Sequence, residues 1–156
     1  MEKRLIKRNG STQESDANWL DLETKVTAEI TSEEPHRPIE LAFRSGTEFG
    51  WRAGDPGVQV IRLIFHQPQR ISRIRLRFSE DDVARTQEFA LRWATDRSQP
   101  FQEIVRQQWN FSPQGSNTEL EDYRVGLNAV GVLELIVNPD VAGGRARASL
   151  DELRIA

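Results

Sequence analysis

Val58-Gln-Val-Ile-Arg-Leu-Ile-Phe65 begins a run of three segments in which apolar and polar residues alternate, as they do in strands with one buried face. The second segment is Ile71-Ser-Arg-Ile-Arg-Leu-Arg-Phe78, and the third is Glu88-Phe-Ala-Leu-Arg-Trp-Ala-Thr95. Turn residues at His66-Gln-Pro-Gln69 separate the first two, and an acidic loop after Ser79 separates the last two. Short strands at this spacing predict an all-β fold, an antiparallel sandwich or barrel.

Segments of strand composition continue on both sides of this run. Residues 25–31 precede it, and residues 39–43 are predicted to form a short strand or a helical turn. Four further strand-like segments follow it, at 102–111, 119–125, 132–138 and 148–155. Residues 1–18 are polar and are predicted to form an N-terminal arm, to which 4–7 could add an edge strand. The remaining residues, 19–156, suffice for a single β-sandwich domain.

The order of the strands predicts where the loops lie. Successive connections between antiparallel strands fall at opposite ends of a sandwich. Residues 66–69, 96–102 and 126–131 are therefore expected at one end. The other end, which we call the long-loop end, is expected to hold 79–87, 112–118, 139–147 and the glycine-rich stretch 46–57. Long polar loops on a rigid scaffold commonly carry binding residues, so we expect the site there.

The composition narrows the classes of function. The chain has 21 basic and 24 acidic residues and a net charge of -3, which argues against electrostatic binding of nucleic acid. It has no cysteine, so it can form neither a disulfide nor a thiolate site. The N-terminus lacks the apolar run of a signal peptide, and no segment has the length of a membrane span. We therefore expect a soluble, cytoplasmic protein.

Several motifs resemble the galactose-binding-like family, which includes the discoidin and coagulation-factor C-type domains and sugar-binding modules. The matching segments are Val26-Thr-Ala-Glu-Ile-Thr-Ser32, Phe49-Gly-Trp51 with Val60-Ile-Arg-Leu-Ile-Phe65, Pro68-Gln-Arg-Ile-Ser-Arg-Ile-Arg-Leu76, Phe89-Ala-Leu-Arg-Trp93 and Ala148-Ser-Leu-Asp-Glu-Leu-Arg-Ile155. The resemblance covers residue 26 to the end of the chain. Each motif is mostly strand alternation, so the order and spacing of the motifs carry the resemblance.

The resemblance implies a jelly-roll β-sandwich without enzymatic activity. Such a protein would bind glycans, lipid head groups or protein surfaces through loops at one end. It also implies that the first strand pairs with the last, which would bring the loop 33–37 to the long-loop end. The family often has an Asp-Gly pair of a structural calcium site where this chain has Arg44-Ser45-Gly46, and Glu152 alone does not complete such a site. Structural calcium is therefore not favoured.

Candidate ligand-binding residues lie in the loops of the long-loop end. A sugar site needs planar polar groups that bridge neighbouring hydroxyls and an aromatic face against the ring. The side chains predicted to bind the ligand are Glu33, His36, Arg37, Trp51, Arg52, Asp81, Arg85 and Arg145. In this hypothesis Asp81 or Glu33 accepts hydrogen bonds from the sugar, and Trp51 provides the apolar face. For each charged residue the alternative is a solvated loop position.

Structural alternatives are kept for the tryptophans and for a stripe of arginines. Trp51 also fits a buried anchor, which is the stronger interpretation, and Trp93 is in phase with Phe89 and Leu91 and is assigned to the core. The arginines at 73, 75 and 77 alternate with apolar residues and so share one face of a strand. They are expected to pair with acids on neighbouring strands rather than to hold a phosphate.

Known catalytic motifs do not occur in the sequence. His36 and His66 are its two histidines, and there is no Gly-x-Ser-x-Gly elbow, phosphate-binding glycine loop or histidine spacing for a metal. The acidic run Glu80-Asp81-Asp82 fits a solvated loop better than a glycosidase pair. The sequence therefore favours a non-catalytic module that binds a carbohydrate or similar polar ligand without a cofactor. The alternative is an intracellular protein–protein interaction domain of the same fold.

Overall fold

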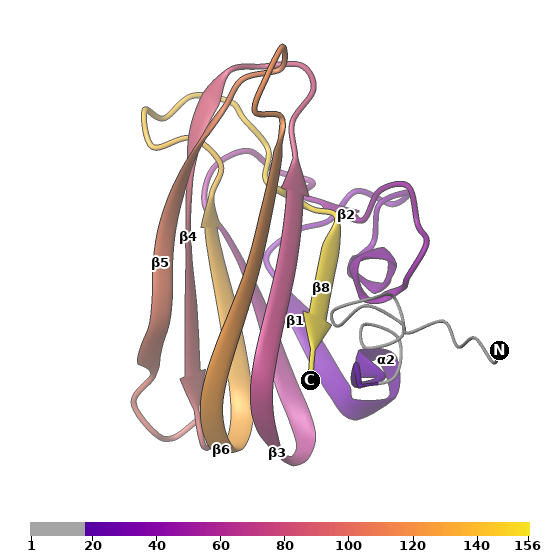
Figure 1. The fold of residues 1–156 in the computed structure, drawn as a ribbon, viewed down its shortest axis with the longest axis vertical. Helices are drawn as coiled ribbons and strands as arrows, with labels where there is room; N and C mark the ends of the chain where they lie inside the picture. Colours follow the sequence, from indigo (N-terminus) through magenta and orange to yellow (C-terminus); the bar gives the residue numbers. More distant parts are fainter. Residues whose placement is uncertain (1–17) are drawn as a thin grey trace, which may run out of the picture.

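The computed structural model describes residues 18–156, which form an almost entirely antiparallel β structure (Figure 1). Two short helical pieces, α2 (Leu22–Lys25) and the 3-10 helix η1 (Ile39–Phe43), flank the first strand. The strands are β1 (Val26–Ile30), β2 (Trp51–Arg52), β3 (Gln59–Ser79), β4 (Arg85–Ala94), β5 (Gln102–Phe111), β6 (Thr118–Asn138), β7 (Ser149–Leu150) and β8 (Glu152–Ile155). The predicted arm, except for Asn18, lies outside the described residues.

Two long strands form the centre of the fold. β3 and β6 each span 21 residues and pair with each other along almost their whole length. Both bend back at one end, so that their two halves lie one behind the other (Figure 1). The turn predicted at 66–69 and the break predicted between 125 and 132 are therefore wrong: each is a bend within a continuous strand.

The physical reason for this difference is a pair of irregular corners. Backbone pairing continues through the bend at Gln69↔Val130 and Ile71↔Leu127, with register shifts between these pairs. Extra residues in one strand bend it and increase its twist, so two paired strands can turn together from one layer into the next. Ala129 adopts φ 56° within this corner, a backbone conformation that is uncommon for a non-glycine residue. Turn-type residues in the sequence thus mark a bend rather than the end of a strand.

The two halves of β3 and β6 belong to two packed layers. One layer contains β1, the first half of β3, the second half of β6, β4 and β5 in that order. The other contains β8, the second half of β3 and the first half of β6. Phe78 and Phe89 are buried between the layers, with ring centroids 5.2 Å apart, and Trp93 packs against the same core. The predicted all-β sandwich is confirmed.

The expected pairing of the first strand with the last is wrong. β1 instead pairs antiparallel with β3, from Val26↔Phe65 to Ile30↔Ile61. β8 pairs with the second half of β3, so both strands use β3 as their neighbour in different layers. A backbone hydrogen bond, from Leu20 N to the Ile155 carbonyl at 2.8 Å, joins the chain before β1 to β8.

The arginine stripe of β3 lies on the outer face of the smaller layer and is paired, as predicted. Arg73 contacts Asp122 on β6 at 2.6 Å, and Arg77 contacts Asp151 at 3.3 Å. Arg75 lies 3.9 Å from Glu152 on β8. Carboxylates on β6, on β8 and just before β8 thus lie beside each arginine of the stripe, as cross-strand pairing of opposite charges predicts.

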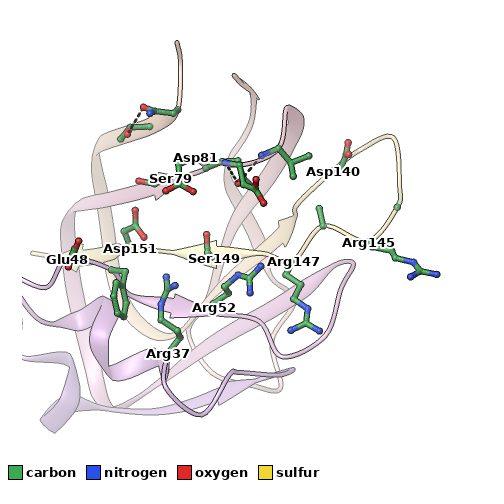
Figure 2. A pocket seen from close by; sticks show the side chains of 18 of the residues that line it. Arg37, Glu48, Arg52, Ser79, Asp81, Asp140, Arg145, Arg147, Ser149 and Asp151 are labelled. Atoms are coloured by element: carbon green, nitrogen blue, oxygen red, sulfur yellow. Dashed lines mark hydrogen bonds between the residues drawn. The ribbon is translucent and has the colours of Figure 1, made fainter. Parts of the chain in front are cut away.

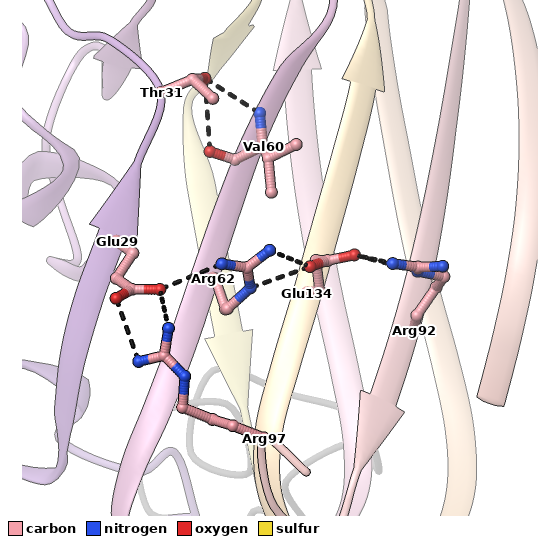
Figure 3. A network of polar contacts seen from close by, with 7 residues as sticks. All are labelled: Glu29, Thr31, Val60, Arg62, Arg92, Arg97 and Glu134. Carbon is pink, nitrogen blue, oxygen red and sulfur yellow. Dashed lines mark hydrogen bonds and ion pairs between the residues drawn. The ribbon is translucent and has the colours of Figure 1, made fainter. Parts of the chain in front are cut away.

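A second charge network crosses the outer face of the larger layer (Figure 3). The Glu134 carboxylate on β6 accepts hydrogen bonds from Arg62 on β3 and from Arg92 on β4, although its residue is only 1% exposed. Arg62 also pairs with Glu29 of β1 at 3.1 Å, and Arg97 pairs with the same carboxylate. The network ties four strands together because Arg62 of β3 bridges Glu29 of β1 and Glu134 of β6, and Glu134 also accepts from Arg92 of β4.

The loops sort to the two ends of the sandwich as the alternation predicts. The bends of β3 and β6 and the β4–β5 loop lie at the lower end of Figure 1, and the β3–β4, β5–β6 and β6–β7 loops lie at the upper, long-loop end. Within residues 18–156, no helix combines the length and the apolar character required to cross a bilayer.

Candidate functional site

An open pocket of about 860 Å³ lies at the long-loop end (Figure 2). The β3–β4 loop and the β6–β7 loop form much of its wall, and Ser149 of β7 and the adjoining Asp151 form its base. β2 and β7 are a two-residue antiparallel pair, Trp51↔Leu150 and Arg52↔Ser149. The pocket therefore depends on segments distant in sequence, which the sandwich brings to one end.

Arg85, buried beneath the pocket, connects two of the loops that surround it. Its guanidinium donates to Glu80 at 2.7 Å, to the Pro139 carbonyl at 2.6 Å and to Gln87 at 3.2 Å, and it lies over the Phe111 ring. Burial alone would raise the pKa of Glu80, but hydrogen bonds from Arg85 and from the loop backbone lower it. Arg85 thus joins the β3–β4 loop to the β6–β7 loop through buried, charge-assisted hydrogen bonds.

One wall of the pocket carries arginines. Arg52 pairs with Glu34 at 2.5 Å, and Arg147 contacts the same carboxylate at 3.3 Å. Arg37 donates through Nε to the Gly50 carbonyl at 2.7 Å, and its guanidinium lies 4.2 Å from the Phe49 ring centroid. Partial burial lowers the pKa of Arg37, and nearby carboxylates oppose that shift, so this side chain remains cationic at neutral pH.

The facing wall carries carboxylates from the β3–β4 and β6–β7 loops. Asp81 and Asp82 are exposed, and Asp140 accepts a hydrogen bond from the backbone of its own loop at 3.0 Å. Figure 2 places Asp81 on the opposite side of the pocket from Arg37 and Arg52. The pocket is thus lined by opposite charges on opposite sides.

The base of the pocket consists of Ser149 and Asp151, which lie between the two walls in Figure 2. Ser149 is 8% exposed and Asp151 is 5% exposed. One carboxylate oxygen of Asp151 accepts from Arg77 at 3.3 Å. The Ser149 hydroxyl has no hydrogen-bond partner within residues 18–156. A hydroxyl group on β7 and a carboxylate between β7 and β8 thus lie at the base of the pocket.

Four of the predicted site residues line this pocket. These are Arg37, Arg52, Asp81 and Arg145. Their gathering follows from the loop arrangement, and their part in binding stays a prediction. Glu33 and His36 do not line it. Glu33 instead accepts a hydrogen bond from the Ile39 backbone at 2.9 Å and borders a separate hollow beneath β1, and His36 is exposed at the surface.

Two other candidates are structural and must be corrected. Trp51 is fully buried, and its indole N–H donates to the Ser32 carbonyl at 3.0 Å, so its ring cannot stack on a ligand. The side chain of Arg85 is 1% exposed and its hydrogen bonds are directed to the protein. Arg85 therefore positions the loops and does not contact the pocket contents.

An aromatic ring and the polar base of the pocket were not predicted from the sequence. Phe49, two residues before Trp51, is 44% exposed and lines the pocket. A short strand with no readable period gave no signal for which of the two aromatic residues would be buried. Ser149 and Asp151 were hidden within a strand-like segment, where alternation assigns residues to faces but does not reveal a pocket.

The residues of this chain do not fit the structural calcium site of the galactose-binding-like family. Arg44, which stands where that family often has a carboxylate, pairs with Glu23 at 2.8 Å. Glu152 lies beside Arg75 on the neighbouring strand. Across residues 18–156, no three side chains of His, Asp or Glu are grouped so that they could hold a metal ion. A cation at the Arg44 position would meet a positive charge instead of oxygen ligands.

Solved structures of carbohydrate-binding modules share this fold. A family 32 module of Clostridium perfringens NanJ in complex with galactose has a TM-score of 0.63 and 16% identity, covering 88% of this chain and 96% of that one. A second C. perfringens module, in complex with GalNAc-β-1,3-galactose, has a TM-score of 0.63 and 19% identity, covering 88% and 99%. The chain has the galactose-binding-like fold.

The same fold occurs in a protein that binds another protein. A structure of reduced XRCC1 bound to the DNA polymerase β catalytic domain has a TM-score of 0.59 and 10% identity, covering 85% of this chain and 94% of that one. No protein-family model matches the sequence, and no curated protein matches it. At these identities the likeness defines the fold, and the ligand must be argued from the pocket.

Proposed function

We propose that this protein is a non-catalytic binding module that holds a carbohydrate in the pocket at the long-loop end. The observation that carries the proposal is the pocket itself: hydrogen-bond donors on one wall, acceptors on the other, and an exposed aromatic ring at the edge. Its volume, about 860 Å³, is in the range typical of small-molecule sites. The sugar complexes of two proteins with this fold support the same class of ligand.

The lining residues suit a polyhydroxylated ring. Guanidinium groups such as that of Arg37 can donate to two neighbouring hydroxyls, and carboxylates such as Asp81 can accept from two. Phe49 offers an exposed apolar surface for the C–H face of a sugar, and the Arg37 guanidinium lies over one face of its ring. Neither histidine lines the pocket, and His66 contacts Thr27 at 3.2 Å on the larger layer. This arrangement supports binding without chemistry.

Isothermal titration with a panel of neutral, acidic and amino monosaccharides and disaccharides tests this proposal. We expect at least one sugar to bind, and Phe49→Ala to weaken it by about tenfold, because alanine removes the stacking surface. Leu120→Ala is the matched control, since Leu120 is 49% exposed on β6 and lies outside the pocket. Absence of binding by any sugar, or equal binding by Phe49→Ala and wild type, would overturn the proposal.

A second candidate function is docking of a protein partner at the same end. Exposed apolar side chains of Val58, Val83 and Val141 lie on the loops around the pocket, and XRCC1 uses this fold in a protein complex. The double variant Val58→Ser/Val141→Ser would abolish capture of such a partner and leave sugar binding unchanged, because neither valine lines the main pocket. Loss of sugar binding in that variant would show that the protein-docking surface and the sugar pocket are not separate. A cytoplasmic location stays a prediction from the sequence.

A further inference from the structure

Glu119 places a carboxyl group in the interior of the sandwich. It lies opposite Phe78 in the register of β3 and β6, on the inner face of the smaller layer, and it is completely buried. Its Oε1 accepts a hydrogen bond from Gln87 Nε2 at 3.1 Å, whereas its Oε2 is buried and receives no hydrogen bond in the described structure. The Glu121 carboxylate lies beside it. A proton on Oε2, donated to Glu121, satisfies this arrangement better than a buried negative charge without a donor.

The charged and titratable groups around Glu119 come from β6, from β4 and from the β3–β4 loop. On β6, Glu121 is half-buried and accepts a hydrogen bond from the Tyr123 hydroxyl at 3.3 Å. On β4, Arg85 is the cation whose positive charge acts on Glu119, and Arg85 is itself paired with Glu80 of the loop. The inner faces of β3 and β5 at this level carry uncharged side chains: Leu76, Phe78, Gln107, Trp109 and Phe111.

Arg85 connects this buried carboxyl group to both loops that form the wall of the pocket. Its guanidinium holds the β3–β4 loop through Glu80 and the β6–β7 loop through the Pro139 carbonyl. The same guanidinium donates to Gln87 Oε1 at 3.2 Å. The Gln87 amide therefore stands between the arginine and Glu119, because its oxygen accepts from one and its nitrogen donates to the other. A chain of hydrogen bonds thus runs from the buried carboxyl group to the two loops.

We infer that the proton on Glu119 is a switch that holds or releases the two loops of the pocket. While the proton is present, Glu80 is the carboxylate that Arg85 neutralises. When the proton is lost, a second buried carboxylate competes with Glu80 for the same guanidinium, because a buried charge is costly unless an opposite charge compensates it. The Arg85 side chain then moves toward Glu119, and its hydrogen bonds to Glu80 and to the Pro139 carbonyl weaken. The β3–β4 and β6–β7 loops separate as a result.

The direction of the switch follows from the state of Glu119 at neutral pH. Burial, together with a hydrogen bond to Glu121, raises the pKa of Glu119 to about 8. The folded protein therefore keeps this proton at pH 7 and loses it as the pH rises through about 8, so the loops are held in neutral solution and released in alkaline solution. The movement of the loops requires no ligand, and only its effect on sugar affinity rests on the proposed function.

Methyl NMR signals of two loop valines report the switch without any sugar. Val83 lies in the β3–β4 loop, and Val141 lies in the β6–β7 loop, where its N–H donates to the Thr86 carbonyl at 2.9 Å. In 13C–1H spectra recorded from about pH 6 to about pH 9.5, we expect both methyl signals to shift with the same midpoint as the carboxyl carbon of Glu119, near pH 8. Val26 on β1 is the internal reference and should not shift.

Three variants assign the methyl shifts to the buried carboxyl group. Glu119→Gln can still accept from Gln87 and cannot ionise, so it should abolish the shifts of both loop valines. Glu121→Gln should lower the midpoint, because it removes the neighbouring negative charge that favours the proton. Glu103→Gln, at an exposed residue of β5, is the control and should titrate as wild type does. Unchanged methyl shifts in Glu119→Gln would overturn the switch, and so would a Glu119 carboxyl carbon that titrates in the ordinary range for glutamate.

Sugar affinity distinguishes failure of the switch from failure of the proposed function. A sugar that binds at pH 7 should bind wild type about tenfold more weakly at about pH 9.5, because release of the loops lowers the population that can bind. It should bind Glu119→Gln equally at both pH values. An equal loss of affinity in both proteins would overturn the link between Glu119 and the pocket. Loop valines that titrate as expected in a protein that binds no sugar would support the switch and overturn the proposed function.

Discussion

The buried carboxyl group of Glu119 predicts a pH-dependent stability that can be measured without knowing the ligand. Glu119 is completely buried near the start of β6. Its Oε1 accepts a hydrogen bond from Gln87 Nε2 at 3.1 Å, and its Oε2 is buried without a partner in the described structure. Burial, together with the nearby Glu121 carboxylate, raises the pKa of Glu119 to about 8, and Gln87 and the positive charge of Arg85 offset only part of that shift.

The sign of the effect follows from which state holds the proton. In the unfolded chain this group has a pKa of 4.5, so between pH 4.5 and about 8 the folded protein binds the additional proton. Its contribution to stability is complete below pH 4.5 and is lost as the pH rises through 8. The difference between the pKa values of the unfolded and folded states, at about 1.4 kcal/mol per pH unit, limits this contribution to the free energy of unfolding to about 5 kcal/mol. Glu121 is half-buried and can turn toward water, so we expect about 2–3 kcal/mol.

Urea unfolding of wild type and Glu119→Gln at pH values from 5 to 9 measures this quantity. Glutamine keeps the shape and can accept from Gln87, and it cannot ionise. Wild type should lose about 2–3 kcal/mol across the range, while Glu119→Gln should lose far less and be the more stable protein at pH 9. Glu103→Gln, at an exposed residue of β5, should keep the wild-type slope. An identical pH slope in wild type and Glu119→Gln would show that Glu119 does not cause the pH dependence of stability.

Three further substitutions test the packing around the site. Gly50→Ala should lower the free energy of unfolding, measured by thermal unfolding, by about 3 kcal/mol. The added Cβ would lie 2.2 Å from the Leu150 carbonyl oxygen and would force β2 away from β7. Gly126→Ala is the control and should cost less than about 1 kcal/mol, because no atom lies within 4 Å of the added Cβ. Glu134→Gln should lower the free energy of unfolding in urea by about 3 kcal/mol, because Arg62 and Arg92 would then face an uncharged group. A urea midpoint equal to that of wild type would contradict this expectation. Arg85→Ala should lose sugar binding together with about 3–5 kcal/mol of stability, and loss of binding at unchanged stability would mean direct contact with the ligand.

The two-layer fold and its loop ends could be predicted because they depend only on alternation and strand direction. Residues 66–69 look like a turn and form a bent, bulged corner, yet in both cases the chain reverses direction between the layers. The assignment of each later loop to an end therefore stayed correct. What the sequence could not reveal was that β3 and β6 keep their backbone pairing through the corner, since that requires knowing which strands are neighbours.

The site could be predicted only as far as its loops. Charged residues such as Asp81 and Arg145 gather because their loops share an end. The sequence could not reveal that Trp51 is buried and Phe49 is exposed, because a two-residue strand is too short for alternation to assign its faces. Arg85 was assigned to the ligand because a loop arginine is usually solvated, whereas here the first residue of β4 is covered by the Pro139 loop.

The most direct test of the central claim is a map of ligand-induced shifts in a 15N–1H NMR spectrum. A sugar that binds in the titration is added to wild-type protein, with a sugar that does not bind as the comparison. We expect the shifts to concentrate at the backbone amides of residues 48–52, 80–83 and 145–151 and to spare the bends of β3 and β6 at the other end. Shifts centred on those bends or on the outer sheet faces, or a spectrum unchanged by every sugar, would contradict it.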